Sequence, residues 1–143
     1  MPQCMWPIDT MSDKKHILIV DDDPDQRLGL HIRLKANNFS TAFAADAMTS
    51  IVEARKHQPD LIILDLGLPA GDGFVVMERL KNIIPLAVVP VIVVSARANE
   101  PNRERALKAG ASAYLRKPVD NDELLAVIHQ ALGMPDASAL RVS

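Results

Sequence analysis

Three short runs of branched apolar residues constrain the fold of this 143-residue chain more than any other feature. The runs are Ile17–Val20 (ILIV), Leu61–Leu64 (LIIL) and Val91–Val94 (VIVV). A continuous apolar run of this length is typical of a strand that is buried on both faces of a parallel sheet. Segments with helical features separate the runs, so we expect each strand to be joined to the next by a crossover that packs on the sheet.

Two weaker strands and five helices complete the predicted pattern. The weaker strands are Thr41–Ala44 and Ala113–Leu115. The helices are marked by start signals, by apolar spacing or by a stop signal, at Asp23-Pro24, Asp46, Phe74 to Leu80, Pro101–Ala109 with Gly110, and Asp120-x-x-Glu123. Strands that alternate with helices in this way predict a doubly wound α/β fold with a parallel sheet covered on both faces.

The spacing of apolar residues also predicts which faces of the helices are buried. In the second helix Met48, Ile51 and Val52 share one face. In the third and last helices the inward residues are expected to be Phe74, Met77, Leu80, Leu124, Val127, Ile128 and Ala131.

Composition excludes several classes of protein. The 16 Lys and Arg residues nearly balance the 18 Asp and Glu residues, for a formal charge of −2, so the chain lacks the basic footprint of a general nucleic-acid binder. A single cysteine, Cys4, excludes an intrachain disulfide framework and a Cys-rich zinc site. The longest apolar run, Ile83–Val94, is interrupted by two prolines and is too short for a membrane helix, and the first ten residues do not resemble a secretory signal. We therefore expect a cytoplasmic protein with no membrane contact.

Polar side chains follow the predicted strands where each strand ends. Asp21 and Asp22 follow the first strand, Asp65 the third, Ser95 the fourth, and Lys117 the fifth. Because ligands of doubly wound sheets bind at the carboxyl ends of the strands, we expect these five side chains to form one site.

The residue types at this edge predict phosphoryl chemistry. Three neighbouring carboxylates repel one another unless a cation lies among them, and hard oxygen ligands without Cys or His suit Mg²⁺ or Mn²⁺. A lysine and a hydroxyl can bind anionic oxygens, and a carboxylate can act as a nucleophile that forms an aspartyl phosphate.

Four segments, ILIVDDDP, LIILDLGLPAGDG, VIVVSA and AGASAYLRKP, resemble the receiver domain of bacterial two-component response regulators, including the chemotaxis regulators. The resemblance covers residues 15–132 and leaves residues 1–14 as an N-terminal extension and residues 133–143 as a tail or linker. It implies a flavodoxin-like (βα)5 fold with five parallel strands in the order 2-1-3-4-5.

The resemblance also implies roles for the residues of the site. Asp65 is expected to accept a phosphoryl group from a histidine kinase or phosphotransfer protein. Asp21, Asp22, Asp65 and the backbone carbonyl of Gly67 are expected to bind Mg²⁺, and Lys117 is expected to contact the phosphoryl oxygens. The Lys117–Pro118 peptide bond is expected to be cis.

A second group of residues is implied to control switching. Ser95 matches the hydroxyl that moves to the phosphoryl group, and Tyr114 matches the aromatic side chain that then turns inward. The surface formed by the fourth helix, fifth strand and fifth helix, about residues 98–132, is expected to bind a downstream protein or a second copy of the chain. Gly67 and Arg97 lie where the family tunes hydrolysis, and we hypothesise that missing bulk at Gly67 admits water and shortens the phosphate lifetime.

Two alternatives to a stand-alone signalling switch remain open. The chain could be a receiver from a larger hybrid kinase or DNA-binding regulator, although Ser112-Ala113 differ from the acidic residues that winged-helix regulators often carry there. A small phosphatase of the haloacid-dehalogenase type also uses a nucleophilic Asp, but its nucleophile follows the first strand. If the chain is complete, its short ends leave no room for an output domain, so we expect a protein contact as output, no direct nucleic-acid binding, and no catalysis beyond its own phosphorylation and dephosphorylation.

Overall fold

The computed structural model describes residues 14–68, 72–96 and 100–134 of the chain. Cys4, Arg97, and most of the predicted extension and tail lie outside the described residues. In chain order the elements are β1 (His16–Val20), α2 (Pro24–Ala36), β2 (Ser40–Ala44), α3 (Ala47–His57), β3 (Leu61–Asp65), α4 (Asp72–Lys81), α5 (Ile84–Ala87), β4 (Val91–Ser95), α6 (Glu100–Lys108), β5 (Ala113–Arg116) and α7 (Asn121–Leu132).

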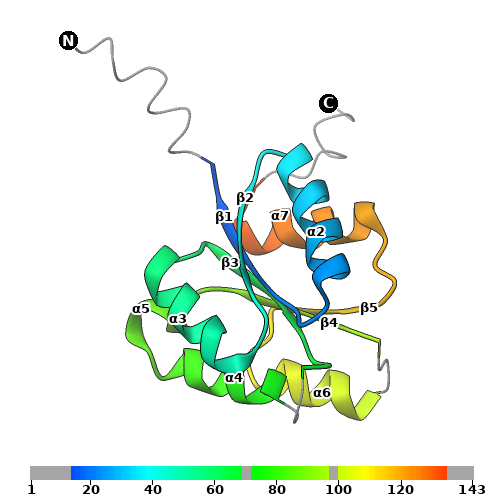
Figure 1. Cartoon of the computed structure of the whole chain (residues 1–143). Coiled ribbons are helices and arrows are strands. Elements are labelled where there is room, and N and C mark those ends of the chain that lie inside the picture. The colour runs from blue at the N-terminus through cyan, green and yellow to red at the C-terminus, as the bar shows by residue number, and fades with distance from the viewer. Residues whose placement is uncertain (1–13, 69–71, 97–99, 135–143) are drawn as a thin grey trace, which may run out of the picture.

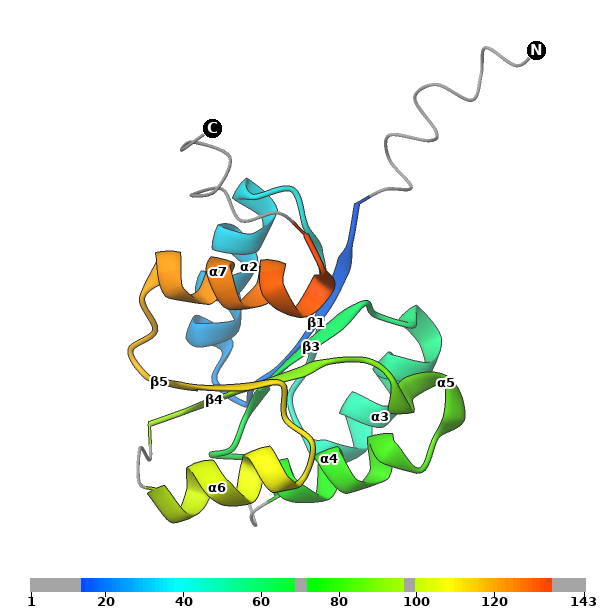
Figure 2. The same cartoon turned by 180° about the vertical axis from the view of Figure 1, so that it is seen from behind.

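The five strands form one parallel sheet in the order β2-β1-β3-β4-β5. Helices α2 and α7 cover one face of the sheet, and α3, α4 and α6 cover the other (Figures 1 and 2). The direction of winding reverses between β1 and β3, which makes the carboxyl ends of these two strands the topological switch point. The predicted fold class and strand order are therefore confirmed.

The centre of the sheet forms the core on both of its faces. Every residue of β3 and β4 is buried, and Ile62 and Ile92 have no exposed surface. Ile62 belongs to the core cluster beneath α3, α4 and α6, whereas Ile92 belongs to the cluster beneath α2 and α7. Branched side chains suit this position because they pack well on a pleated surface.

Aspartate caps start three helices at the positions that the sequence predicts. The Asp23 carboxylate accepts a hydrogen bond from the backbone N–H of Asp25 at 2.9 Å, with Pro24 in the first turn of α2. Asp46 and Asp120 cap α3 and α7 in the same way, at 2.7 and 3.0 Å. Each cap contributes about 1 kcal/mol and fixes where a strand-to-helix loop ends, so the caps help to place the loops at the carboxyl edge of the sheet.

The predicted inward face of α3 is wrong. Met48 and Val52 are exposed, with 73% and 55% of their surface accessible, and only Ile51 of the predicted three packs on the core. The buried residues of α3 are Ala47, Ser50 and Ala54. These small residues let the helix approach β1, β2 and α4 closely, which turns the larger side chains of the neighbouring face toward solvent.

Helix α5 is a second difference from the predicted pattern of five helices. It has four residues and begins at Ile84, with Pro85 in its first turn. Its Leu86 is buried, whereas Ile84 is 87% exposed.

The predicted inward faces of α4 and α7 are confirmed, since their members are buried or pack on the core. Among the described residues, no helix is both long enough and apolar enough to span a membrane.

Candidate phosphoryl and metal site

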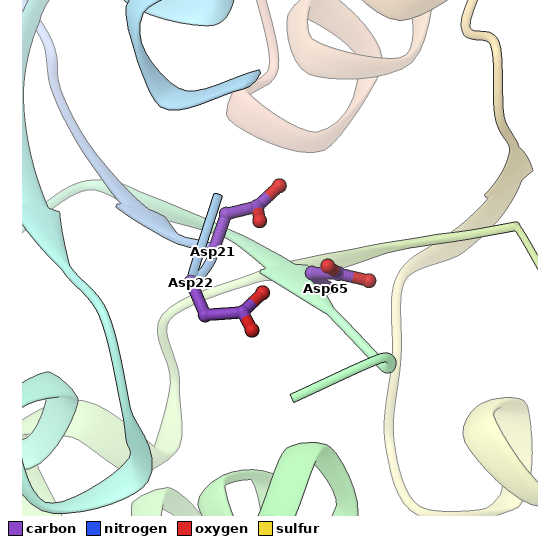
Figure 3. Close-up of side chains that lie close together, drawn as sticks. All are labelled: Asp21, Asp22 and Asp65. Atoms are coloured by element: carbon purple, nitrogen blue, oxygen red, sulfur yellow. The ribbon is translucent and has the colours of Figure 1, made fainter. Parts of the chain in front are cut away.

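The carboxyl ends of β1 and β3 bring three carboxylates together, as Figure 3 shows. One oxygen from each of Asp21, Asp22 and Asp65 lies within 4.8 Å of the others. Asp21 and Asp65 are only 2% and 8% exposed, whereas Asp22 is exposed to solvent. The predicted acidic cluster therefore exists as a geometric unit with two buried members and one open side.

Backbone hydrogen bonds hold Asp21 in place. Its N–H donates to the carbonyl of Ala44 on β2 at 3.0 Å, which continues the pairing of β1 with β2. Its Oδ1 accepts from the N–H of Asp23 at 2.9 Å, and its carbonyl accepts from Nη1 of Arg27 at 2.7 Å. The turn into α2 is thus fixed from both ends, and Oδ2 of Asp21 faces the site, where it accepts a hydrogen bond from Nζ of Lys117.

Asp65 is held by its own loop. The N–H of Gly67 donates to Oδ1 of Asp65 at 2.8 Å. A Cβ atom on Gly67 would lie 3.2 Å from the same oxygen, so any side chain at this position would emerge beside the carboxylate. The glycine therefore leaves the space next to Oδ1 open.

Lys117 joins the two buried carboxylates. Its ammonium Nζ lies 3.1 Å from Oδ2 of Asp65 and 3.3 Å from Oδ2 of Asp21. The Lys117 backbone N–H donates to the carbonyl of Ser95 at 2.9 Å, and the Lys117–Pro118 peptide bond is cis, as predicted. The loop after β5, the strand at one edge of the sheet, thus places the ammonium of Lys117 beside the acidic cluster.

The charges of the cluster are not balanced. Burial raises the pKa of the Asp21 carboxyl, and the neighbouring charge of Asp65 adds to the effect. The hydrogen bond from Asp23 and the ammonium of Lys117 act in the opposite direction, but the pKa of Asp21 remains above its ordinary value. One lysine therefore does not compensate the acidic cluster fully, and a divalent cation between the carboxylates would stabilise their ionised forms.

The structure places the two predicted switch residues on neighbouring strands. Ser95 ends β4, one residue beyond the pair that Val94 makes with Asp65, and it is 1% exposed. Tyr114 lies on β5 opposite Val93 and packs, partly buried, against the core cluster beneath α4 and α6. Both positions are compatible with a movement that couples the site to β5, and their roles remain predictions.

Sequence reasoning missed two residues of α2 that touch the site. Arg27 bonds the backbone of Asp21, and Gln26 accepts a hydrogen bond from Nζ of Lys117. The signal for both was their place in the first turn of the helix that directly follows the acidic motif.

A groove of about 500 Å³ lies between α2 and the loop after β5. It is lined by Gln26 and Lys117, together with Leu30, Arg33, Pro118 and Val119.

The comparisons with known proteins agree with this geometry. Residues 17–129 match the family described as the response regulator receiver domain. The KDP operon transcriptional regulatory protein KdpE of Escherichia coli (strain K12) is 41% identical over 117 residues, which are 82% of this chain and 51% of that protein. The DNA-binding dual master transcriptional regulator RpaA of Synechocystis sp. is 37% identical over 120 residues, which are 84% of this chain and 50% of that protein. The chain thus spans about half the length of these two regulators.

A solved structure with a metal ion also has this fold. It is the receiver domain of the sensor histidine kinase PA1611 from Pseudomonas aeruginosa, described with a magnesium ion coordinated in its active site cleft. It is 28% identical to this chain, with a TM-score of 0.77, and the match covers 84% of this chain and 98% of that one.

Proposed function

Because the chain belongs to the response regulator receiver domain family, we propose that Asp65 accepts a phosphoryl group in a Mg²⁺-dependent reaction and that this switches a protein-binding surface. The proposed donor is a phosphohistidine of a histidine kinase or phosphotransfer protein in the cytoplasm. The observation that carries the proposal is the contact of Lys117 with Asp65 beside two further carboxylates at the switch point of the sheet.

The donor atoms fit Mg²⁺. Asp21, Asp22 and Asp65 offer hard carboxylate oxygens, the ligand type that Mg²⁺ prefers, and the backbone carbonyl of Gly67 is the proposed fourth protein ligand. The raised pKa of Asp21 supports this assignment, since a cation at the cluster removes the cause of the shift. The bound metal would supply positive charge that neutralises the phosphoryl oxygens.

The residues of the chain then act as follows. A carboxylate oxygen of Asp65 forms the new bond to phosphorus, while the bond from phosphorus to the donor imidazole breaks and its electron pair leaves with the imidazole. The ammonium of Lys117, which already lies 3.1 Å from Asp65, donates to a phosphoryl oxygen. The hydroxyl of Ser95 donates to another phosphoryl oxygen.

The proposed output follows from the position of β5. Movement of Ser95 toward the phosphoryl group would make room for Tyr114 to turn inward. Tyr114 lies between α6 and α7 along the chain, so its movement would change the surface formed by α6, β5 and α7, within residues 100–132. A downstream protein or a second copy of the chain would bind this surface in one of its two states.

The comparisons support one of the two alternative functions, a receiver within a longer regulator, more than the other, a phosphatase. The half-length match to KdpE and RpaA supports a receiver that works within a longer regulator, and in that case the output surface contacts the rest of the same protein. The family match favours a signalling domain over a haloacid-dehalogenase-type phosphatase. Steady turnover of a simple phosphate ester such as p-nitrophenyl phosphate would favour the phosphatase.

Intact-protein mass spectrometry after incubation with acetyl phosphate and Mg²⁺ tests the proposal. We expect the mass of one phosphoryl group on the wild-type chain and on Asp122→Asn, whose exposed carboxylate lies on α7. We expect no added mass on Asp65→Asn or in the presence of EDTA. An unlabelled wild-type chain, or a fully labelled Asp65→Asn variant, would contradict the proposal.

A further inference from the structure

The ammonium of Lys117 has three oxygen partners, and they differ in chemistry. Two are the carboxylates of Asp21 and Asp65, and the third is Oε1 of Gln26 on the first turn of α2. The contacts of Nζ with Asp21 and Gln26 are hydrogen bonds, and Asp65 is its ion-pair partner at 3.1 Å. Gln26 is the neutral member of the set and lies outside the acidic cluster.

The two carboxylates change their partners when a phosphoryl group is transferred. In the proposed reaction Asp65 becomes an acyl phosphate, and Asp21 is engaged by the metal ion. Both therefore lose part of their attraction for Lys117 at the step in which the lysine must face the phosphoryl oxygens. The amide oxygen of Gln26 takes part in neither change, so it can keep one N–H of Lys117 throughout the reaction.

We propose that Gln26 is a positioning residue that holds the Lys117 ammonium at the phosphoryl site, and this inference rests on the proposed function. Gln26 and Lys117 both line the groove between α2 and the loop after β5, where the amide oxygen accepts a hydrogen bond from the ammonium. The bond orients the lysine without adding a fourth negative charge beside the phosphoryl group. A glutamate in this place would bond the same ammonium but repel the incoming anion.

The test uses the full chain, three single variants, and the Lys117→Met variant with and without Gln26→Met. Gln26→Met keeps the length and approximate volume of the side chain but removes the acceptor, and Gln26→Glu keeps the acceptor but adds charge. Gln58→Met makes the same exchange at an exposed position at the end of α3 and is the matched control. The readouts are the rate of phosphoryl incorporation from phosphoramidate at saturating Mg²⁺, the affinity for Mg²⁺, and the melting temperature.

We expect Gln26→Met to lower the phosphorylation rate by about three- to tenfold, the effect of one hydrogen bond to a charged, partly exposed group. We expect Gln26→Glu to be at least as slow, and Gln58→Met to match the wild type. The affinity for Mg²⁺ and the melting temperature of Gln26→Met should equal those of the wild type, because Gln26 does not touch the metal ligands. In the Lys117→Met background, Gln26→Met should have no further effect on the rate.

The outcomes separate this inference from the proposed function. A wild-type chain that takes up no phosphoryl group overturns both. A phosphorylated wild type with an equally fast Gln26→Met variant overturns the role of Gln26 alone. An equal loss of rate in Gln58→Met, or a parallel loss of Mg²⁺ affinity in Gln26→Met, would show a general structural effect and would also overturn that role.

Discussion

The interior of β3 and its carboxyl end differ in kind within five residues. Leu61 to Leu64 are apolar, wholly buried and packed by helices on both faces of the sheet. Asp65, the next residue, is also buried but lies beside a second buried carboxylate, with one lysine to offset them. The interior is apolar and buried, whereas its end lies beside Asp21, whose charged form is disfavoured by burial. Residues that cost stability in this way are expected at functional sites.

A cavity in the interior should have the largest effect on stability. Ile62→Ala removes a fully buried side chain between β1 and β4 and should lower the free energy of unfolding by about 2–5 kcal/mol. Val52→Ala, on the exposed face of α3, is the control and should change it by less than about 0.5 kcal/mol. Urea unfolding measures both, and equal losses in the two variants would contradict the described core.

Metal binding should affect the edge of the sheet and leave the interior unchanged. Mg²⁺ at 100 times its dissociation constant should stabilise the wild type by about 2.7 kcal/mol, because the proposed site exists only in the folded chain. Asp22→Asn, which changes the exposed member of the cluster, should lose most of this gain and keep the stability of the metal-free chain. Thermal unfolding with Mg²⁺ and with EDTA gives both values, and an undiminished gain in Asp22→Asn would exclude that residue as a ligand.

Removal of a buried charge from the edge should stabilise the metal-free chain. The raised pKa of Asp21 means that the folded state binds its proton more tightly than the unfolded state does, so this group opposes folding increasingly as the pH rises above its ordinary value of 3.8. In EDTA at pH 7, Asp21→Asn should therefore raise the free energy of unfolding, by an amount on the order of 1 kcal/mol. The gain should disappear toward pH 3, and a destabilised variant at pH 7 would show that Lys117 outweighs the burial.

The smallest expected effect concerns the lifetime of the phosphorylated state. A side chain at Gly67 would begin 3.2 Å from Oδ1 of Asp65 and shield it from water. Gly67→Met should slow the loss of phosphate several-fold, which corresponds to about 1 kcal/mol or less in the barrier. Decay of the labelled protein after removal of the donor measures the rate, and a decay no slower than that of the wild type would exclude shielding at this position.

The contrast between the apolar interior of the sheet and its polar carboxyl edge explains which features could be predicted from the sequence. Strands β1, β3 and β4 are marked by uniform apolar runs, and capping aspartates mark three helices, so the sheet and the residues at its carboxyl edge followed directly. The face of α3 could not be predicted, because small residues such as Ala54 carry little hydrophobic signal. Helix α5 is too short to show a period.

Gln26 shows the corresponding limit for the site. It is a neutral residue on a helix surface, and it gains significance only through Lys117, which lies 91 positions later in the chain. The charged residues of the site were recognisable because each follows a strand that ends at the same edge. A residue that acts through such a group has no signal of its own, and the folded chain is needed to find it.

Asp65 is the residue that we propose takes up the phosphoryl group. Sodium borohydride reduces an acyl phosphate to the alcohol, so a phosphorylated aspartate appears as homoserine when the digested protein is sequenced by mass spectrometry. After treatment with phosphoramidate and Mg²⁺, homoserine is expected at position 65, and at no position in EDTA. Homoserine at position 21 or 22, or its absence from a sample that carries a phosphoryl group, would contradict the account.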